Sequence, residues 1–194
     1  MYSDICSAAF IMEKGRGRLI GKFSEKTLAA CAYRGELLGL LAIHLLLLAV
    51  NKLTPTLSGS TQIYSDCLGA LHNVENLPPH RIPSSCRHSD ILKNIMIHCR
   101  ALTFNTIFSH VSAHKLDHFA WEELSRPEQL NEQCDSGAKL AIYDTDPNAG
   151  MAAQPLPLEP ICVYVDHGKE KMTSDTGERV RFHGHRKLAR EIFA

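Results

Sequence analysis

Several features are missing from this sequence, and each absence excludes a class of protein. The seven cysteines are scattered, odd in number and never arranged as CxxC, which excludes a disulfide framework or a structural zinc finger as the basis of the fold. The formal net charge is zero, so the chain lacks the basic surplus that drives non-specific nucleic-acid binding. Any nucleic-acid function must therefore depend on a local site.

Long hydrophobic runs are also missing. The most apolar stretch, residues 37–50, includes His44 and is shorter than the ~20 residues that a membrane-spanning helix needs. The first residues do not have the basic-then-apolar layout of a signal peptide. We therefore expect a soluble intracellular protein, cytoplasmic or nuclear, with no membrane partner.

What is present predicts an α/β chain. Apolar periodicity and turn residues indicate two strands joined by a glycine-containing turn, a long helix, a third strand, two helices, a fourth strand and a last helix. In that order the segments are 6–13, 18–23, 33–51, 61–65, 67–74, 91–102, 104–111 and 128–143. Ser89 and Asp90 are candidate N-caps for the helix at 91–102. No internal repeat is present.

Composition divides the chain into three parts. Residues 1–143 are expected to form one α/β domain. Residues 144–160 are rich in Asp, Pro, Gly and Ala, which is typical of a linker. Residues 161–194 form a C-terminal extension, with a strand predicted at 161–165 and a basic helix around 185–193.

Three short sequence segments each place one acidic residue on a predicted helix or strand. Glu36 lies near the start of the long helix, Asp66 ends the strand at 61–65, and Asp135 lies early in the last helix. Mg²⁺ prefers oxygen ligands, and two such ions about 4 Å apart can stabilise both the attacking and the leaving oxygen of a phosphodiester. The pattern predicts metal-dependent hydrolysis of nucleic acid, with two Mg²⁺ (or Mn²⁺) ions in an intact site.

Each of these acids also has a simpler interpretation. Glu36 could be an ordinary acid on a helix surface. Asp66 could cap the helix that follows it, and Asp135 could be an exposed acid favoured by the helix dipole. These alternatives remain open from the sequence alone.

Two other groups have a site interpretation that the sequence does not favour. His88, His98 and Cys99 suggest zinc, but no second pair of ligands lies at a suitable spacing. A basic cluster near the C-terminus could contact a phosphate backbone, although a solvated helix end is the simpler explanation. It consists of His183, His185, Arg186, Lys187 and Arg190. Tyr33 and Trp121 are expected to be packing residues.

Four motifs, in this order, resemble the type 1 ribonuclease H family as found in the polyproteins of non-LTR retrotransposons. They are AYRGELLGLLAI (32–43), IYSDCLGAL (63–71), HVSAHKLDH (110–118) and LNEQCDSGAK (130–139). The resemblance covers about residues 6–143, and the tail from residue 155 is similar to the segment that follows such a domain in retroelement reading frames. It implies a ribonuclease H-like mixed sheet flanked by helices.

The resemblance also implies an activity and the residues that perform it. Glu36, Asp66 and Asp135 match the acids that hold two Mg²⁺ ions in the family. His114 matches the histidine of a mobile loop that assists proton movement or product release, with His110 as a nearby competitor. The implied substrate is the RNA strand of an RNA–DNA hybrid, and a reverse transcriptase domain in a longer parent polyprotein is the implied partner.

The chain departs from the family at its start. The family begins with a central strand that ends in an aspartate, but here only residues 1–5 precede the first predicted strand. We therefore expect the first, central strand to be missing. Asp4 and Asp166 are further candidate ligands, the latter if residues 161–165 fill the vacant position.

Three functions remain open. The chain could be an active ribonuclease H, or a catalytically inactive retroelement remnant or hybrid-binding module with an incomplete metal site. It could also be another nuclease or an integrase of the same fold.

Overall fold

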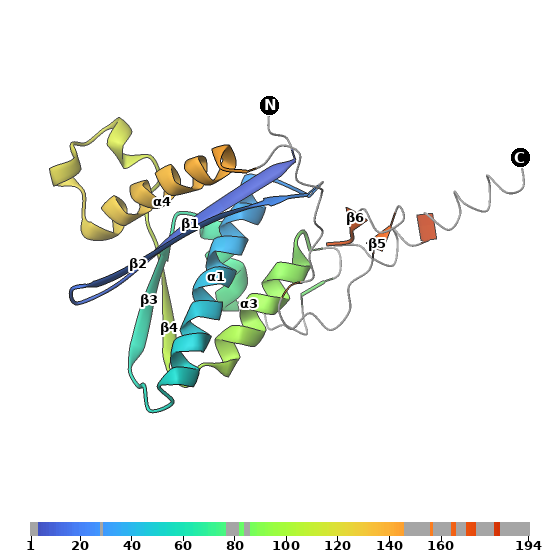
Figure 1. Cartoon of the computed structure of the whole chain (residues 1–194), viewed down its shortest axis with the longest axis horizontal. Helices are drawn as coiled ribbons and strands as arrows, with labels where there is room; N and C mark the ends of the chain where they lie inside the picture. The colour runs from blue at the N-terminus through green and yellow to red at the C-terminus, as the bar shows by residue number, and fades with distance from the viewer. Residues whose placement is uncertain are drawn as a thin grey trace, which may run out of the picture.

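The computed structural model describes residues 4–27, 29–76, 82–83, 86–145, 156, 164–165, 170–173 and 181–182. These residues form a mixed α/β structure (Figure 1). Its main elements, in chain order, are β1 (Ile5–Lys14), β2 (Gly17–Lys26), α1 (Ala32–Leu53), β3 (Ser60–Ser65), α2 (Leu68–Asn76), α3 (Ser89–Ala101), β4 (Asn105–His110) and α4 (Arg126–Tyr143). The predicted α/β order is confirmed, and most elements extend a few residues beyond the predicted bounds.

The first two strands form the predicted hairpin. Lys14 pairs with Gly17 across a tight turn in which Gly15 has a φ of 58°. Glycine adopts this left-handed backbone without the steric cost that a side chain would add. The turn sequence therefore determines the register of the whole hairpin, which runs from this pair back to Ile5 opposite Lys26.

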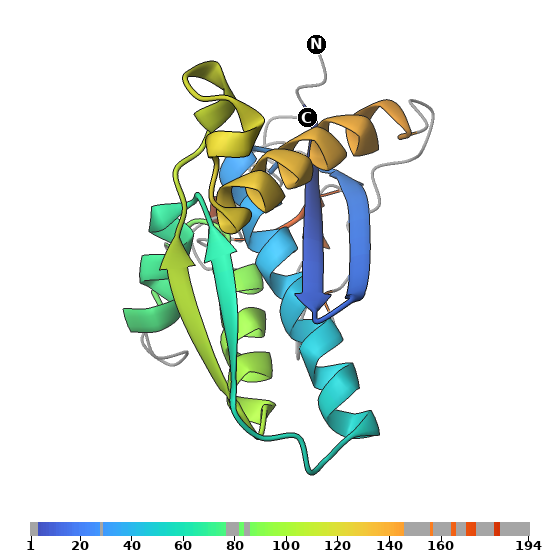
Figure 2. The same ribbon diagram turned by 90° about the vertical axis from the view of Figure 1, so that its left-hand side faces the viewer.

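The described strands form separate pairs, whereas the sequence predicts one mixed sheet without its first strand. β1 and β2 pair in antiparallel fashion, and β3 and β4 pair in parallel fashion from Ser60 opposite Asn105 to Ser65 opposite His110. Figure 2 shows α1 crossing behind the space between the two pairs, with β1 and β3 running in opposite directions. The α/β class is confirmed, and the finer arrangement remains a proposal.

Helix α1 forms the centre of the core. Its buried residues include Leu37, Leu40 and Leu41, which pack with Ile91 and Ile95 of α3. The helix has 22 residues, more than the apolar run in the sequence indicates, and its length and hydropathy match those of a membrane span. Buried core helices have the same properties, and among the described residues α1 is the one helix that meets these two criteria.

Glycines allow β1 to lie very close to the helices on either side of it (Figure 1). A Cβ built on Gly35 of α1 would collide with the carbonyl oxygen of Ser7. On α4, a Cβ on Gly137 would lie 3.1 Å from the Cβ of Ala9. The backbones of α1 and β1 therefore touch at Gly35, and any larger residue there would force them apart.

A buried ion-pair network joins α1 to β2 and α3. Arg34 is 1% exposed. Its Nε donates to Glu25 Oε2 at 2.6 Å, and its Nη1 lies 3.6 Å from Asp90 Oδ2. Lys171 Nζ lies 3.3 Å from the same Asp90 oxygen. Because the charges are removed from water, the network is stable only while every member keeps its partner.

The start of α3 differs from the sequence prediction. The helix begins at Ser89, and the capping position is His88, whose φ of 58° is left-handed and whose side chain makes no capping hydrogen bond. Asp90 lies inside the first turn and pairs with Arg34 and Lys171. The prediction of Ser89 or Asp90 as the N-cap was therefore wrong, because a long-range ion pair uses the carboxylate.

The described part of the C-terminal extension contacts the start of α3. Tyr164–Val165 (β5) pairs with Glu170–Lys171 (β6). Met172 is buried, and the carbonyl oxygen of Thr173 accepts a hydrogen bond from Ser89 Oγ at 3.2 Å. The predicted linker at 144–160 lies almost wholly outside the described residues, as do Asp166 and the basic cluster of 183–190.

The Arg34 network provides a test of the fold. We expect Arg34→Met to lower the free energy of unfolding by about 3–5 kcal/mol, because the buried Asp90 and the partly buried Glu25 would lose the guanidinium. Urea unfolding followed by circular dichroism measures the change. The matched control is Arg126→Met, which removes an exposed arginine that also pairs with a glutamate, Glu13, and should change stability little. Equal losses in the two variants would contradict a dominant role for the buried network.

Candidate functional site

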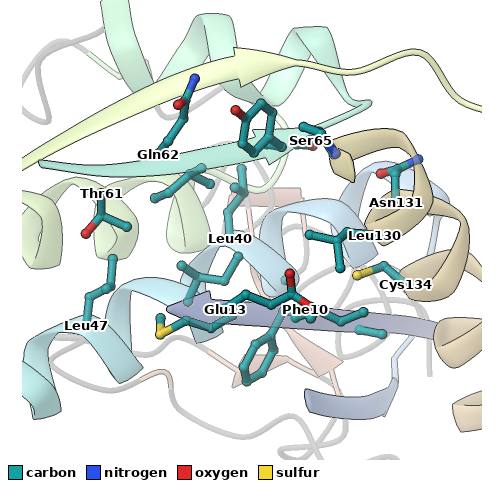
Figure 3. Close-up of a pocket in the computed structure, with 18 of the residues that line it drawn as sticks. Phe10, Glu13, Leu40, Leu47, Thr61, Gln62, Ser65, Leu130, Asn131 and Cys134 are labelled. Atoms are coloured by element: carbon teal, nitrogen blue, oxygen red, sulfur yellow. The ribbon is translucent and has the colours of Figure 1, made fainter. Parts of the chain in front are cut away.

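The structure brings the three predicted acids to one place. Glu36 comes from the second turn of α1, Asp66 directly follows β3, and Asp135 lies in the middle of α4. All three line a single groove of about 720 Å³ between β1 and β3. Figure 3 shows this groove with Ser65 and Cys134, the residues directly before Asp66 and Asp135. The alternative interpretation of Glu36 as an ordinary surface acid is therefore not supported.

The carboxylates influence one another. Burial, reinforced by the negative charges of Asp66 and Asp135, raises the pKa of Glu36 from 4.5 to about 7. Burial and Asp66 also raise the pKa of Asp135, an effect that the neighbouring His114 partly offsets. The ion pairs of the described residues involve other carboxylates. His114 and Lys139 offset part of this charge at Asp135, and the remaining excess of like charge forms a place where a cation would bind favourably.

Asp66 is positioned by a residue that the sequence analysis did not single out. Asn131 Nδ2 of α4 donates to Asp66 Oδ2 at 3.2 Å. Cys67, the residue before α2, is held by Ser65, whose Oγ accepts from the N–H of Cys67 at 3.1 Å. The Cys67 thiol, and not the Asp66 carboxylate, lies at the backbone N–H groups of Gly69 and Ala70 in the first turn of α2, so the capping interpretation of Asp66 is not supported. Asn131 lies one turn before Asp135 in the same acidic motif, a spacing that places both on one face of a helix.

The loop between β4 and α4 brings His114 toward Asp135. It contains the short helix η2 (Lys115–Asp117), and His114 directly precedes it with a left-handed φ of 55°. Glu132 Oε1 of α4 accepts hydrogen bonds from the N–H groups of Lys115 at 2.7 Å and Leu116 at 3.4 Å. Since Glu132 and Asp135 lie about one turn apart on α4, this anchor holds the exposed His114 close to Asp135.

His110, the competitor of His114, is engaged differently. Its Nε2 lies 3.2 Å from the carbonyl oxygen of Asp66. His110 therefore contacts the backbone of the site, whereas His114 influences the Asp135 carboxylate.

The donor chemistry of this cluster fits a hard divalent cation. Three carboxylates and the Asn131 amide supply oxygen atoms, which Mg²⁺ and Mn²⁺ prefer. Among the described residues, however, no three His, Cys, Asp or Glu side chains lie in the arrangement of a formed metal site. Binding of an ion would therefore require these side chains to move closer together.

The further candidate ligands do not join the cluster. Asp4 precedes β1, its Oδ2 lies 4.0 Å from Lys26 Nζ, and it is not among the residues that line the groove. Asp166 lies outside the described residues. The adjacent Tyr164–Val165 pairs with Glu170–Lys171 and does not line the groove.

The residues considered for zinc have separate partners. His88 Nε2 lies 3.2 Å from Cys31 Sγ, and burial and the Arg34 guanidinium lower the pKa of His88 to about 4. His98 and Cys99 lie about 15 Å further along α3. His98 contacts Asn94 and Cys99 contacts Thr106. The sequence argument against zinc agrees with this separation.

The two aromatic residues expected to pack differ in environment. Tyr33 is partly buried against the core, and its hydroxyl accepts from Asn73 Nδ2 at 2.9 Å. Trp121, in the short helix η3 (Trp121–Glu123), is 36% exposed.

Comparison with known proteins adds no relative: no protein-family model matches the chain, and no curated protein matches it. The carboxylate cluster, the groove and the anchored loop are the observations that bear on function.

The cluster predicts an unusual pH dependence of stability. A folded-state pKa near 7 for Glu36, above its unfolded value of 4.5, means that the fold favours the protonated acid. Its contribution to stability is complete below pH 4.5 and is lost as the pH rises through 7. We expect Glu36→Gln to be more stable than the parent by about 1–3 kcal/mol at pH 8, and nearly equal to it at pH 4. Urea unfolding in the presence of EDTA at both pH values measures this difference.

The control for this experiment is Glu75→Gln, which alters an exposed acid of α2. Its stability relative to the parent should be the same at both pH values. A gain in Glu36→Gln that did not grow between pH 4 and pH 8 would contradict the electrostatic description of the site.

Proposed function

We propose that the chain is a ribonuclease H-type endonuclease that hydrolyses the RNA strand of RNA–DNA hybrids with the help of two Mg²⁺ or Mn²⁺ ions. The observation that carries the proposal is the convergence of Glu36, Asp66 and Asp135 at one end of a groove. These acids come from the three elements that the ribonuclease H resemblance specifies. The raised pKa of Glu36 supports it further, because burial and then the negative charges of Asp66 and Asp135 disfavour its ionised form, and a bound cation would offset both effects.

Glu36, Asp66 and Asp135 would hold the metal ions. When bound, such ions activate a water molecule and stabilise the leaving oxygen of the scissile phosphate. The chain's own residues orient the ligands: Asn131 fixes one oxygen of Asp66, and the close contact at Gly35 sets the position of the adjacent Glu36. Ligands that act as a unit depend on such positioning, since an error of about 1 Å can cost 10²-fold in rate.

His114 would act as the proton-transfer residue. It is exposed, it lies beside Asp135, and the Glu132 anchor keeps its loop on α4. Histidine is the side chain that most often transfers protons in active sites. Its place beside an acid of the cluster suits a role in proton movement or product release.

The proposed substrate and setting follow from the same resemblance. A hybrid is recognised through its shallow minor groove and its 2′-hydroxyls and not through base sequence, which is compatible with a chain of zero net charge and a local site. The proposed context is a retroelement-derived polyprotein with a reverse transcriptase domain, acting inside the cell.

A second function is favoured by two observations. The described side chains do not form a metal site in the geometry of the structure, and a groove separates β1 from β3. Both are expected of a catalytically inactive retroelement remnant, or of a hybrid-binding module with an incomplete metal site. The two functions differ in turnover and not in hybrid binding.

The decisive experiment is cleavage of an RNA–DNA hybrid labelled on the RNA strand, in about 5 mM Mg²⁺ at pH 8. We expect cleavage by the parent and a loss of about 100-fold or more in Asp66→Asn, because removal of one ligand disables the set. The matched control is Asp117→Asn, an exposed acid in η2 that does not line the groove, which should cleave as the parent does.

Absence of cleavage by the parent, with retained binding of the hybrid in a gel-shift assay, would assign the chain to the inactive alternative. Equal cleavage by the parent and Asp66→Asn would contradict the proposed site.

A further inference from the structure

The long walls of the groove are strand edges. β1 pairs with β2 along one edge, and β3 pairs with β4 along one edge. Residues 7–14 of β1 and 60–65 of β3 line the groove, together with residues of α1, α4 and the adjoining loops, but no residue of β2 or of β4 does so. The groove therefore faces the edges of β1 and β3 that have no strand partner in the described part of the chain. The N–H and C=O groups of such edges are able to pair with an added strand.

The directions of the two edges suit one inserted strand. β1 and β3 run in opposite directions, as the arrows in Figure 2 show. A strand placed between them would be antiparallel to one and parallel to the other, and both kinds of pairing are common. At present the thiol of Cys134 contacts the backbone of Ile11 on the β1 edge. An incoming amide group would replace this weak contact with a stronger hydrogen bond.

The size of the groove agrees with a short strand. One residue of a packed strand occupies about 160 Å³, from a rise of about 3.3 Å, a strand spacing of about 4.8 Å and a layer thickness of about 10 Å. The groove volume of about 720 Å³ therefore holds four to five residues. That length is close to the six residues of β3, which forms one wall.

The floor of the groove is apolar. Leu40, Ile43 and Leu47 of α1 line it, as Figure 3 shows for Leu40 and Leu47. Successive side chains of a strand point to opposite faces. Every second side chain of the occupant would therefore contact α1, and an apolar residue is favoured at each of these positions.

The charge of the groove differs between its ends. Glu36, Asp66 and Asp135 gather at one end, and the ion pairs of the described residues involve other carboxylates. Toward the other end Glu13 already pairs with Arg18 and Arg126. A lysine or arginine of the bound segment would therefore pair with the carboxylates at the first end. At the second end the acid, Glu13, already has arginine partners.

We propose that the groove between β1 and β3 binds an extended peptide segment in trans, about five residues long, that joins the two strand pairs into one sheet. The segment is apolar at alternate positions and carries a lysine or arginine next to the three carboxylates. This binding goes beyond the proposed nuclease function and requires no catalysis, so that either can fail without the other.

Fluorescence anisotropy of a labelled peptide tests the proposal. The probe is a hexapeptide of alternating valine and threonine that ends in an amidated lysine, titrated with the full chain in EDTA, because Mg²⁺ would compete for the carboxylates. We expect saturable binding. The same peptide with N-methylated amides at alternate residues should bind at least 10-fold more weakly, since it can no longer donate hydrogen bonds to one of the two strand edges.

Two variants of α1 locate the binding. Ile43→Trp fills the groove and should abolish binding, whereas the matched control Leu53→Trp, at an 85% exposed position on the same helix outside the groove lining, should bind as the parent does. Glu36→Gln should weaken binding of the lysine peptide about 3- to 10-fold and leave a norleucine analogue unaffected. Thermal melts establish that each variant is folded.

Three results would overturn the proposal. They are the lack of saturable binding by the folded parent, equal affinity for the N-methylated peptide, and unchanged binding by a folded Ile43→Trp. Self-association of the parent that Ile43→Trp abolishes would assign the groove to a second copy of the chain and would likewise overturn it.

Discussion

The site and the core both depend on the close contact between α1 and β1 at Gly35. Successive residues of an α-helix point about 100° apart, so three consecutive residues face three directions. Gly35 lies against the backbone of Ser7, Arg34 enters the buried ion-pair network, and Glu36 faces the carboxylate cluster. A side chain at position 35 would separate helix and strand, and would displace both charged neighbours. One turn of helix therefore couples the stability of the domain to the geometry of the candidate site.

The two charged neighbours show how differently buried charge can be used. Arg34 is surrounded by acids, so its charge is compensated and holds β2, α1 and α3 together. Glu36 is buried and lies beside other acids, so ionisation of its carboxyl is opposed and its pKa rises. Compensated charge contributes to the stability of a particular fold, whereas uncompensated charge of one sign costs stability and indicates a ligand of the opposite sign.

The groove follows from the same arrangement. With α1 packed against β1 at one end and against α3 along its length, the hairpin and the parallel pair are held on either side of the helix and do not pair with each other (Figure 2). The edges that result face an apolar floor, and the carboxylates collect where β3 ends. Backbone groups, apolar surface and charge thus combine in one groove. Of the features described, this groove is best suited to bind a partner.

Local chemistry allowed the sequence by itself to determine the elements and their order. The glycine turn specified the hairpin, and apolar periodicity specified α1 and α4. The three acids lie on the predicted elements because those elements are short and clearly bounded. Where local signals conflicted with long-range contacts, the sequence misled. Aspartate is a residue type that often caps helices, but Asp90 pairs with Arg34, which lies far from it along the chain. Asn131 lies one turn before Asp135, but only the fold shows that its amide reaches Asp66.

Only the tertiary structure decided that the strands form separate pairs, that Glu36, Asp66 and Asp135 interact, and that a groove adjoins them. These properties arise from burial and from charges that are distant in sequence. No window of neighbouring residues contains them, because a carboxyl group loses its water, and meets other carboxyl groups, only when the helices and strands pack.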